Sequence, residues 1–232
     1  MALYLHSVLV TSPADFFLLY FYKESVSSFR FPMVYVKCYH VVFISFDALM
    51  KIILVRHGKP DINISGKLSS NEMKLWIENY DKSEVSENPP SYFFTNSSVR
   101  NSFVVASPLP RALTSLNMIS IKPDMVDPIF CEAQLPLFNR SWLNLPPMAY
   151  AFLLRVLWFI GFSKNVESYY SAKIRSKSAA AKLINLAQKE STILLMGHGI
   201  MNRMIGSQLK KRGFRKEKLI GKSYWQVTVY EK

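Results

Sequence analysis

The stretch MKIILVRHG, residues 50–58, specifies the fold class of this chain. Within it, residues 52–55 form an uninterrupted run of β-branched and aliphatic side chains. Such a run is typical of a strand that is buried on both faces in a parallel sheet. In open α/β sheets, ligands bind beyond the carboxyl ends of the strands. We therefore expect the functional site to include Arg56, His57 and Gly58, where this strand ends.

The composition of the chain changes at Met50. The first 49 residues hold 12 of the 32 aromatic residues and none of the 8 glycines, and their acidic and basic residues balance. The whole net charge of +13 therefore belongs to residues 50–232. We predict an amino-terminal extension over residues 1–49 that is not part of the fold, and one domain over residues 50–232. Our hypothesis is that Met50 is the natural start and that the extension is translated upstream sequence.

The extension has no clear targeting signal. Its first 22 residues contain no lysine or arginine, so they lack the basic segment of a secretory signal. Residues 31–49 are apolar enough to suggest a membrane anchor, but four polar or helix-breaking residues interrupt the segment: Pro32, Lys37, His40 and Asp47. We expect a cytoplasmic protein, with membrane association as the disfavoured alternative.

Cysteine usage and charge limit the other classes of function. Cys38 and Cys131 lie one in each part, so we expect no disulfide framework. No paired Cys or His spacing of the zinc kind is present, so we expect neither a metal nor a cofactor. We interpret a run of basic residues near the end of the chain as a solvated face, and we expect no nucleic-acid partner. The alternative is that these charges attract anionic partners over long range. The run comprises Arg203, Lys210, Lys211, Arg212, Arg215, Lys216, Lys218 and Lys222.

Strands and helices alternate along residues 50–232. Further strands are predicted over residues 102–106, 126–131, 192–196 and 223–230, and helices over residues 71–80, 108–119, 146–162, 167–188 and 200–211. Ser107 is expected to cap the second helix, with Pro108 at its first position. The segment 146–162 is apolar almost all round, which favours a buried core helix over an apolar wall beside a substrate. The alternation predicts an α/β three-layer sandwich with a mostly parallel central sheet.

Histidines follow two of the predicted strands. His57 and His198 are the two histidines of residues 50–232, and each comes directly after an apolar strand and beside glycine. One such histidine is more often structural, but this repetition favours function. A neutral imidazole can attack phosphorus at physiological pH. The pair therefore indicates phosphoryl transfer.

Arginines and glycines accompany both histidines. Arginine binds phosphate oxygens with a planar, permanently charged fork. Arg56 qualifies because it adjoins the first histidine, and Arg111 qualifies because it opens a helix whose amino-terminal amides favour an anion. Gly58, Gly197 and Gly199 are expected to let the backbone approach the phosphate closely.

Taken in order, these motifs resemble those of the histidine phosphatase superfamily, also called phosphoglycerate mutase-like proteins. The resemblance covers residues 50–232 and none of residues 1–49. It implies the phosphoglycerate mutase-like fold and a metal-independent phosphatase that hydrolyses a phosphomonoester through a phosphohistidine on His57. The matching residues are Arg56-His57-Gly58, Asn63, Gly66, Ser107-Pro108-Leu109-Pro110-Arg111, Glu132 and Gly197-His198-Gly199.

The resemblance also implies roles for single residues. Glu132 would be the general acid that protonates the leaving alcohol and later activates water, with Asp124 and Asp127 as alternatives. His198 would be charged when it holds phosphate. The phosphate-binding groups implied by the resemblance are Arg56, Gly58, Asn63, Arg111 and His198.

One departure narrows the predicted activity. Many mutases of this family follow Arg-His-Gly with Glu-Thr, whereas Lys59-Pro60 stands here. We therefore favour a phosphatase over a mutase-type phosphoryl transferase. A catalytically inactive phosphate-binding protein is the alternative from another class. The expected substrate is a phosphorylated small molecule, or else a phosphoprotein, and residues 146–162 suggest a bulky or partly apolar leaving group.

Overall fold

The computed structural model describes residues 6–12, 15–21, 41–43, 49–63, 65–137 and 144–232. The chain divides into two compact units, Met1–Ala48 and Leu49–Lys232. In the first unit, strands β1 (His6–Ser12), β2 (Asp15–Phe21) and β3 (Val41–Phe43) form an antiparallel sheet in that order. Most of the apolar segment 31–49 lies outside the described residues. Within the described ranges, no helix has the length and apolar character needed to cross a bilayer.

The second unit is built on a six-stranded sheet of order β6-β5-β7-β4-β9-β8. The four strands from β6 to β4 run parallel, and β9 and β8 pair antiparallel at one side. The prediction of a mostly parallel sheet is therefore confirmed. The strands are β4 (Lys51–Arg56), β5 (Phe103–Ala106), β6 (Met125–Val126), β7 (Thr192–Gly197), β8 (Arg215–Ile220) and β9 (Val227–Glu231).

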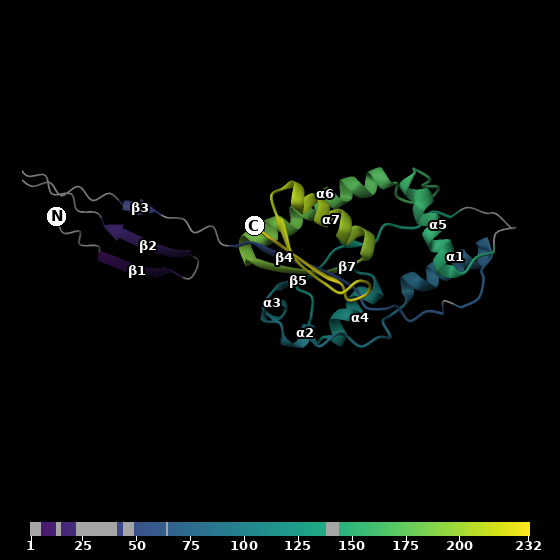
Figure 1. Ribbon diagram of the computed structural model, residues 1–232, viewed down its shortest axis with the longest axis horizontal. Coiled ribbons are helices and arrows are strands. Elements are labelled where there is room, and N and C mark those ends of the chain that lie inside the picture. Colours follow the sequence, from purple (N-terminus) through teal and green to yellow (C-terminus); the bar gives the residue numbers. More distant parts are fainter. Residues whose placement is uncertain (1–5, 13–14, 22–40, 44–48, 64, 138–143) are drawn as a thin grey trace, which may run out of the picture. The chain divides into compact units, whose positions relative to one another are not determined.

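Helices cover both faces of this sheet, which gives three layers (Figure 1). Helices α6 and α7 lie on one face, and α2, α3 and α4 lie on the other (Figure 1). The helices are α1 (Ser70–Lys82), α2 (Tyr92–Thr95), α3 (Ser97–Arg100), α4 (Pro110–Met118), α5 (Pro147–Phe159), α6 (Tyr169–Glu190) and α7 (Gly199–Lys211), with a 3₁₀ turn at Pro128–Phe130.

Strand β4 is buried on both faces, as its apolar run predicts. Ile52 and Leu54 pack into one core cluster with side chains of α6 and α7. Ile53 and Val55 point to the opposite face and join a second cluster with side chains of α4. Because successive side chains of a strand alternate between faces, an unbroken apolar run is needed to fill both layers.

Three predicted boundaries are wrong. Helix α4 begins at Pro110 rather than Pro108, because Pro110 takes the first helical position and Leu109, with no side-chain cap, precedes it. Strand β6 ends at Val126, since Pro128 has no N–H for a ladder and the Asp127 side chain caps a 3₁₀ turn. The last strand begins at Val227 rather than at residue 223.

Strand β8 is absent from the sequence prediction because its residues belong to the basic run. It forms the edge of the sheet and pairs with β9. Charged side chains on an edge strand discourage pairing with other chains. Arg215, Lys216 and Lys218 of the basic run are exposed on this strand, whereas Arg203, Lys210 and Lys211 of the run are exposed on α7.

The prediction of a buried core helix over residues 146–162 holds for one side of the helix only. Helix α5 buries one side through Leu154 and Trp158, but Phe152 is 72% exposed and Ile160, which follows the helix, is 75% exposed. Its exposed apolar side chains recur every fourth residue, and so they form one stripe along the helix. The helix is apolar all round, but the unit covers only one side of it.

Candidate active site

His57 lies directly beyond β4, and its side chain is buried. Its backbone N–H donates to the carbonyl of Gly197, 3.0 Å away, so the ends of β4 and β7 are joined at this point. The ring Nδ1 lies 2.7 Å from the carbonyl oxygen of Gly58. A carbonyl can only accept, so Nδ1 carries the proton and Nε2 keeps its lone pair.

His198 lies beside His57, as expected for residues that follow two parallel strands at the same edge of a sheet. The two ring centroids are 5.1 Å apart. Nε2 of His198 lies 2.7 Å from the hydroxyl oxygen of Ser107, while its buried Nδ1 has no partner among the described residues. The Ser107 hydroxyl thus fixes the ring of a histidine 91 positions away in the sequence, rather than capping α4.

Each of the two predicted arginines has a buried N–H group for which the described residues offer no acceptor. The guanidinium carbon of Arg56 lies 4.4 Å from the ring centroid of Tyr224. Arg111 is buried on α4, and its Nη1 donates to the carbonyl of Tyr80 and to Oδ1 of Asp81, each at 3.2 Å. Nε of each arginine has no partner among the described residues. These donors are available to bind an anion.

Burial and the arginines keep both histidines neutral. Burial lowers the pKa of His57 to about 3, and the guanidinium groups of Arg111 and Arg56 act in the same direction. Burial also lowers the pKa of His198 well below its usual value, again with help from Arg111. The family resemblance implies a charged His198 when it holds phosphate. In the observed surroundings this ring is neutral, and a bound anion would be needed to raise its pKa.

Glu132 lies at the amino terminus of α7, the helix that begins directly after His198. Oε1 accepts hydrogen bonds from the backbone N–H groups of Ala133 and Met201, at 3.0 and 2.9 Å, and Oε2 accepts from that of Ile200 at 3.0 Å. The three N–H donors at the start of α7 and in the next residue thus fix the orientation of the Glu132 side chain.

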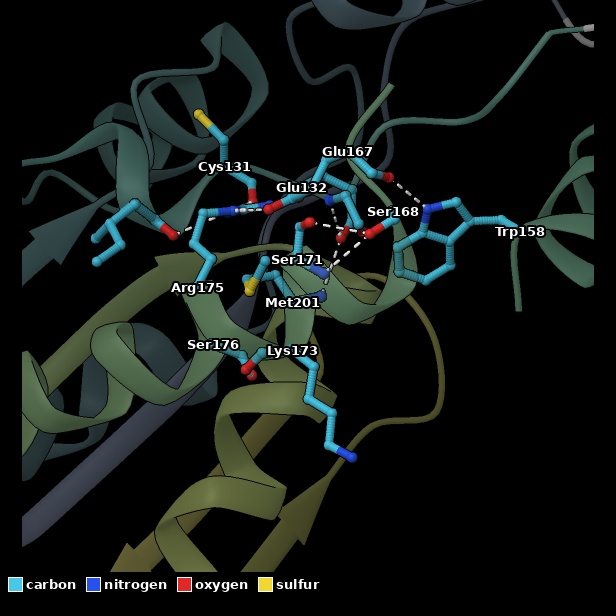
Figure 2. A network of polar contacts seen from close by, with 12 residues as sticks. Cys131, Glu132, Trp158, Glu167, Ser168, Ser171, Lys173, Arg175, Ser176 and Met201 are labelled. Carbon is cyan, nitrogen blue, oxygen red and sulfur yellow. Dashed lines mark hydrogen bonds and ion pairs between the residues drawn. The ribbon is translucent and has the colours of Figure 1, made fainter. Parts of the chain in front are cut away.

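Arg175 holds the segment that carries Glu132 (Figure 2). From α6, its Nη1 donates to the carbonyls of Ile129 and Cys131 at 2.9 and 2.8 Å. The rest of its guanidinium binds both carboxylate oxygens of Glu167. The position of Glu132 is therefore set from two sides, by α6 and by the start of α7.

The other acidic candidates have structural partners. Oδ2 of Asp124 accepts the backbone N–H of Val104 at 2.7 Å. Asp127 pairs with Lys182 and also accepts the N–H of Ile129. Both carboxylates thus hold β5, β6 and the turn after them.

Asn63 is exposed, and its side-chain oxygen accepts from the backbone N–H and the hydroxyl of Ser65, at 2.9 and 2.6 Å. Within the described ranges, no contact joins Asn63 to either histidine or to Arg56 or Arg111. The structure therefore does not bring this predicted phosphate ligand to the other site residues.

Two of the glycines leave no room for a side chain or leave room for a site residue. A Cβ atom on Gly58 would lie 2.7 Å from the Trp225 ring, so no side chain fits there. A Cβ on Gly199 would lie 3.3 Å from Nε of Arg56. Gly199 therefore leaves room for the arginine beside the histidines.

Two tyrosines complete the site, and no sequence motif points to either. Tyr224 lies in the loop before β9, and its ring centroid is 5.8 Å from that of His57. Tyr80 lies near Arg111, whose guanidinium carbon is 4.7 Å from its ring centroid. Burial raises the pKa of Tyr80 to about 12, with Tyr224 as the next cause. Spacing along the chain cannot reveal such residues, because they reach the site from different elements.

Comparisons with known proteins agree with the predicted fold. No family model and no curated protein matches this chain. Among solved structures, the open reading frame Rv3214 of Mycobacterium tuberculosis is 14% identical, with a TM-score of 0.51 over 78% of this chain and 90% of that one. A protein described as mycobacterial hydrolase 2 is 17% identical, with a TM-score of 0.51 over 79% and 82%. The chain thus shares its three-layer α/β fold with these two solved structures, in agreement with the fold that the resemblance implies.

Proposed function

We propose that this protein is a phosphatase that hydrolyses a phosphorylated small molecule through a phosphohistidine on His57. One observation carries the proposal. A neutral His57 has its Nδ1 proton fixed on the Gly58 carbonyl, so the lone pair of Nε2 is available as a nucleophile. Arg56 and Arg111 surround it with N–H groups that have no partner among the described residues.

The reaction would proceed in two displacements. As the monoanion of the phosphomonoester binds, its proton passes to Glu132. Nε2 of His57 attacks phosphorus, the bond from phosphorus to the leaving oxygen breaks, and Glu132 gives that oxygen the proton. Arg56 and Arg111 stabilise the negative charge on the transferring group. Water then attacks the phosphohistidine, its proton returns to Glu132, and the phosphorus–nitrogen bond breaks. His57 is restored, and inorganic phosphate leaves.

The first test is hydrolysis of phenyl phosphate by the full chain in the presence of EDTA. His57→Ala is expected to lower kcat by about 10³-fold or more, because the nucleophile is lost. Arg203→Gln, an exposed position on α7, serves as the control. Wild-type enzyme quenched during turnover should carry phosphate that is labile in acid and stable in base. Equal turnover by His57→Ala would reject the proposal, and phosphate binding without a phosphoenzyme would favour the inactive phosphate-binding alternative.

The identity of the general acid is tested by comparing substrates with different leaving groups. Asp81, 45% exposed and paired with Arg111, is a second carboxylate near the site that no sequence motif indicates. Glu132→Gln is expected to lower kcat by about 10²-fold on phenyl phosphate. The loss should be smaller on 4-nitrophenyl phosphate, whose leaving group needs less protonation. If Asp81→Asn shows this pattern and Glu132→Gln does not, the acid is Asp81.

A further inference from the structure

Arg155 is the single charged residue of α5, and it reaches the segment that carries Glu132. Its Nη2 donates to the carbonyl of Ala133, 2.8 Å away. Its guanidinium carbon lies 4.9 Å from the ring centroid of Trp158. These two contacts fix the guanidinium group. Its other terminal nitrogen, Nη1, is buried and has no partner among the described residues.

A buried guanidinium N–H without a partner is costly, so this nitrogen calls for an explanation. Glu132 is the nearby anion, but both of its oxygens already accept backbone N–H groups. Burial lowers the pKa of Arg155, while the charge of Glu132 acts in the opposite direction. The guanidinium of Arg155 stays charged because the intrinsic pKa of arginine is far above neutral, and one of its donors is left for an acceptor that the described residues do not supply.

The neighbours of Arg155 place it on one side of the site. It holds the residue after Glu132, and it interacts electrostatically with Glu132 and Tyr80. The arginines that act on His57 are instead Arg111 and Arg56. Arg155 thus lies beside the segment that carries the proposed general acid. A general acid contacts the leaving oxygen, so this is the side of the leaving group.

We propose that Arg155 binds a second anionic group, a carboxylate or a second phosphate, on the leaving group of the substrate. This inference rests on the proposed phosphatase function and names its substrate class: phosphomonoesters of acidic alcohols. A guanidinium N–H matches the oxygens of either anion, and a hydrogen bond between charged groups is strong in a buried site.

The test compares three substrates of the full chain: phenyl phosphate, 3-carboxyphenyl phosphate and 3-phosphonophenyl phosphate. We expect kcat/KM to be about tenfold or more higher for one or both of the anionic substrates, the range of one charged hydrogen bond. The anionic substrate with the higher kcat/KM identifies the anion that Arg155 binds. Arg155→Gln should bring the ratio to phenyl phosphate close to one, and Arg203→Gln should keep the wild-type ratio.

The ratio separates substrate binding from a structural role. If Arg155 only supported Ala133, and through it Glu132, then Arg155→Gln would slow all three substrates alike and leave the ratio unchanged. That result would overturn the inference. So would a wild-type enzyme without preference for either anionic substrate, a measurement that needs no variant to fold. Failure to hydrolyse any of the three substrates would instead reject the proposed function.

Discussion

His57 has a pKa of about 3 because its ring is buried and lies near the guanidinium of Arg111. A nucleophilic histidine needs its lone pair, so this environment favours the reactive form over the whole neutral range. The Gly58 carbonyl adds the orientation, because it accepts the Nδ1 proton. Residue type alone would leave the ring partly protonated near its usual pKa of 6.5.

The lowered pKa predicts how stability depends on pH. Between about pH 3 and 6.5 the unfolded chain binds a proton at His57 that the folded protein does not, so stability falls as the pH falls through this window. The loss from His57 alone between pH 7 and pH 5 is roughly 2 kcal/mol. Urea unfolding at pH 7, 6 and 5 measures it. His57→Gln should show a shallower dependence, and identical slopes would mean that His57 is not neutral in the folded protein.

Among the helices, α5 carries two different faces. Leu154 and Trp158 are buried in separate core clusters, while Phe152 and Ile160 are exposed. Because the helix is apolar all round, its composition carries no periodic signal that distinguishes these faces. Burial is decided by what packs against a helix, and that contact depends on residues distant in sequence, such as Met73 of α1.

This difference predicts unequal costs for two similar substitutions. Leu154→Ala removes a fully buried side chain and should lower the free energy of unfolding by about 2–5 kcal/mol. Phe152→Ala removes an exposed side chain and should change it by about 0.5 kcal/mol or less. Urea unfolding of both variants beside the wild type measures the difference. A large loss in Phe152→Ala would show that this face of α5 is covered.

In the chain taken as a whole, residues Leu49–Lys232 form a compact unit of their own. The two large core clusters on the faces of the sheet draw on residues from Met50 onward. The change in composition at Met50 and the division between the units fall within two positions of each other.

We therefore predict that removal of residues 1–48 leaves the fold and the activity of the second unit intact. The free energy of unfolding should stay within about 0.5 kcal/mol of that of the full chain, as for changes outside a core. Urea unfolding and kcat/KM on phenyl phosphate measure both properties. A loss of cooperative unfolding would show that residues 1–48 support the second unit. Mass spectrometry of the native amino terminus tests whether Met50 is the start, and a peptide from residues 1–49 would contradict that hypothesis.

Local sequence patterns are enough to specify the parallel strands and the residues that follow them. The apolar runs of β4 and β7 are such patterns, and parallel strands bring their carboxyl ends to one edge. The pairing of His57 with His198 therefore follows from the amino-acid sequence alone, as does the placement of Arg56 and Arg111 beside them. The same patterns fail for β8, where charges hide the strand, and at residues 107–109, where a second proline moves the helix start.

The partners of each site residue, by contrast, depend on tertiary contacts. Ser107 reaches His198, Tyr80 and Tyr224 approach the arginines and His57, and Arg155 extends from α5 to Ala133. The neutral state of the histidines and the available donor of Arg155 follow from burial by segments far apart in the chain. Burial and charge act through space, so no spacing along the sequence could have specified them.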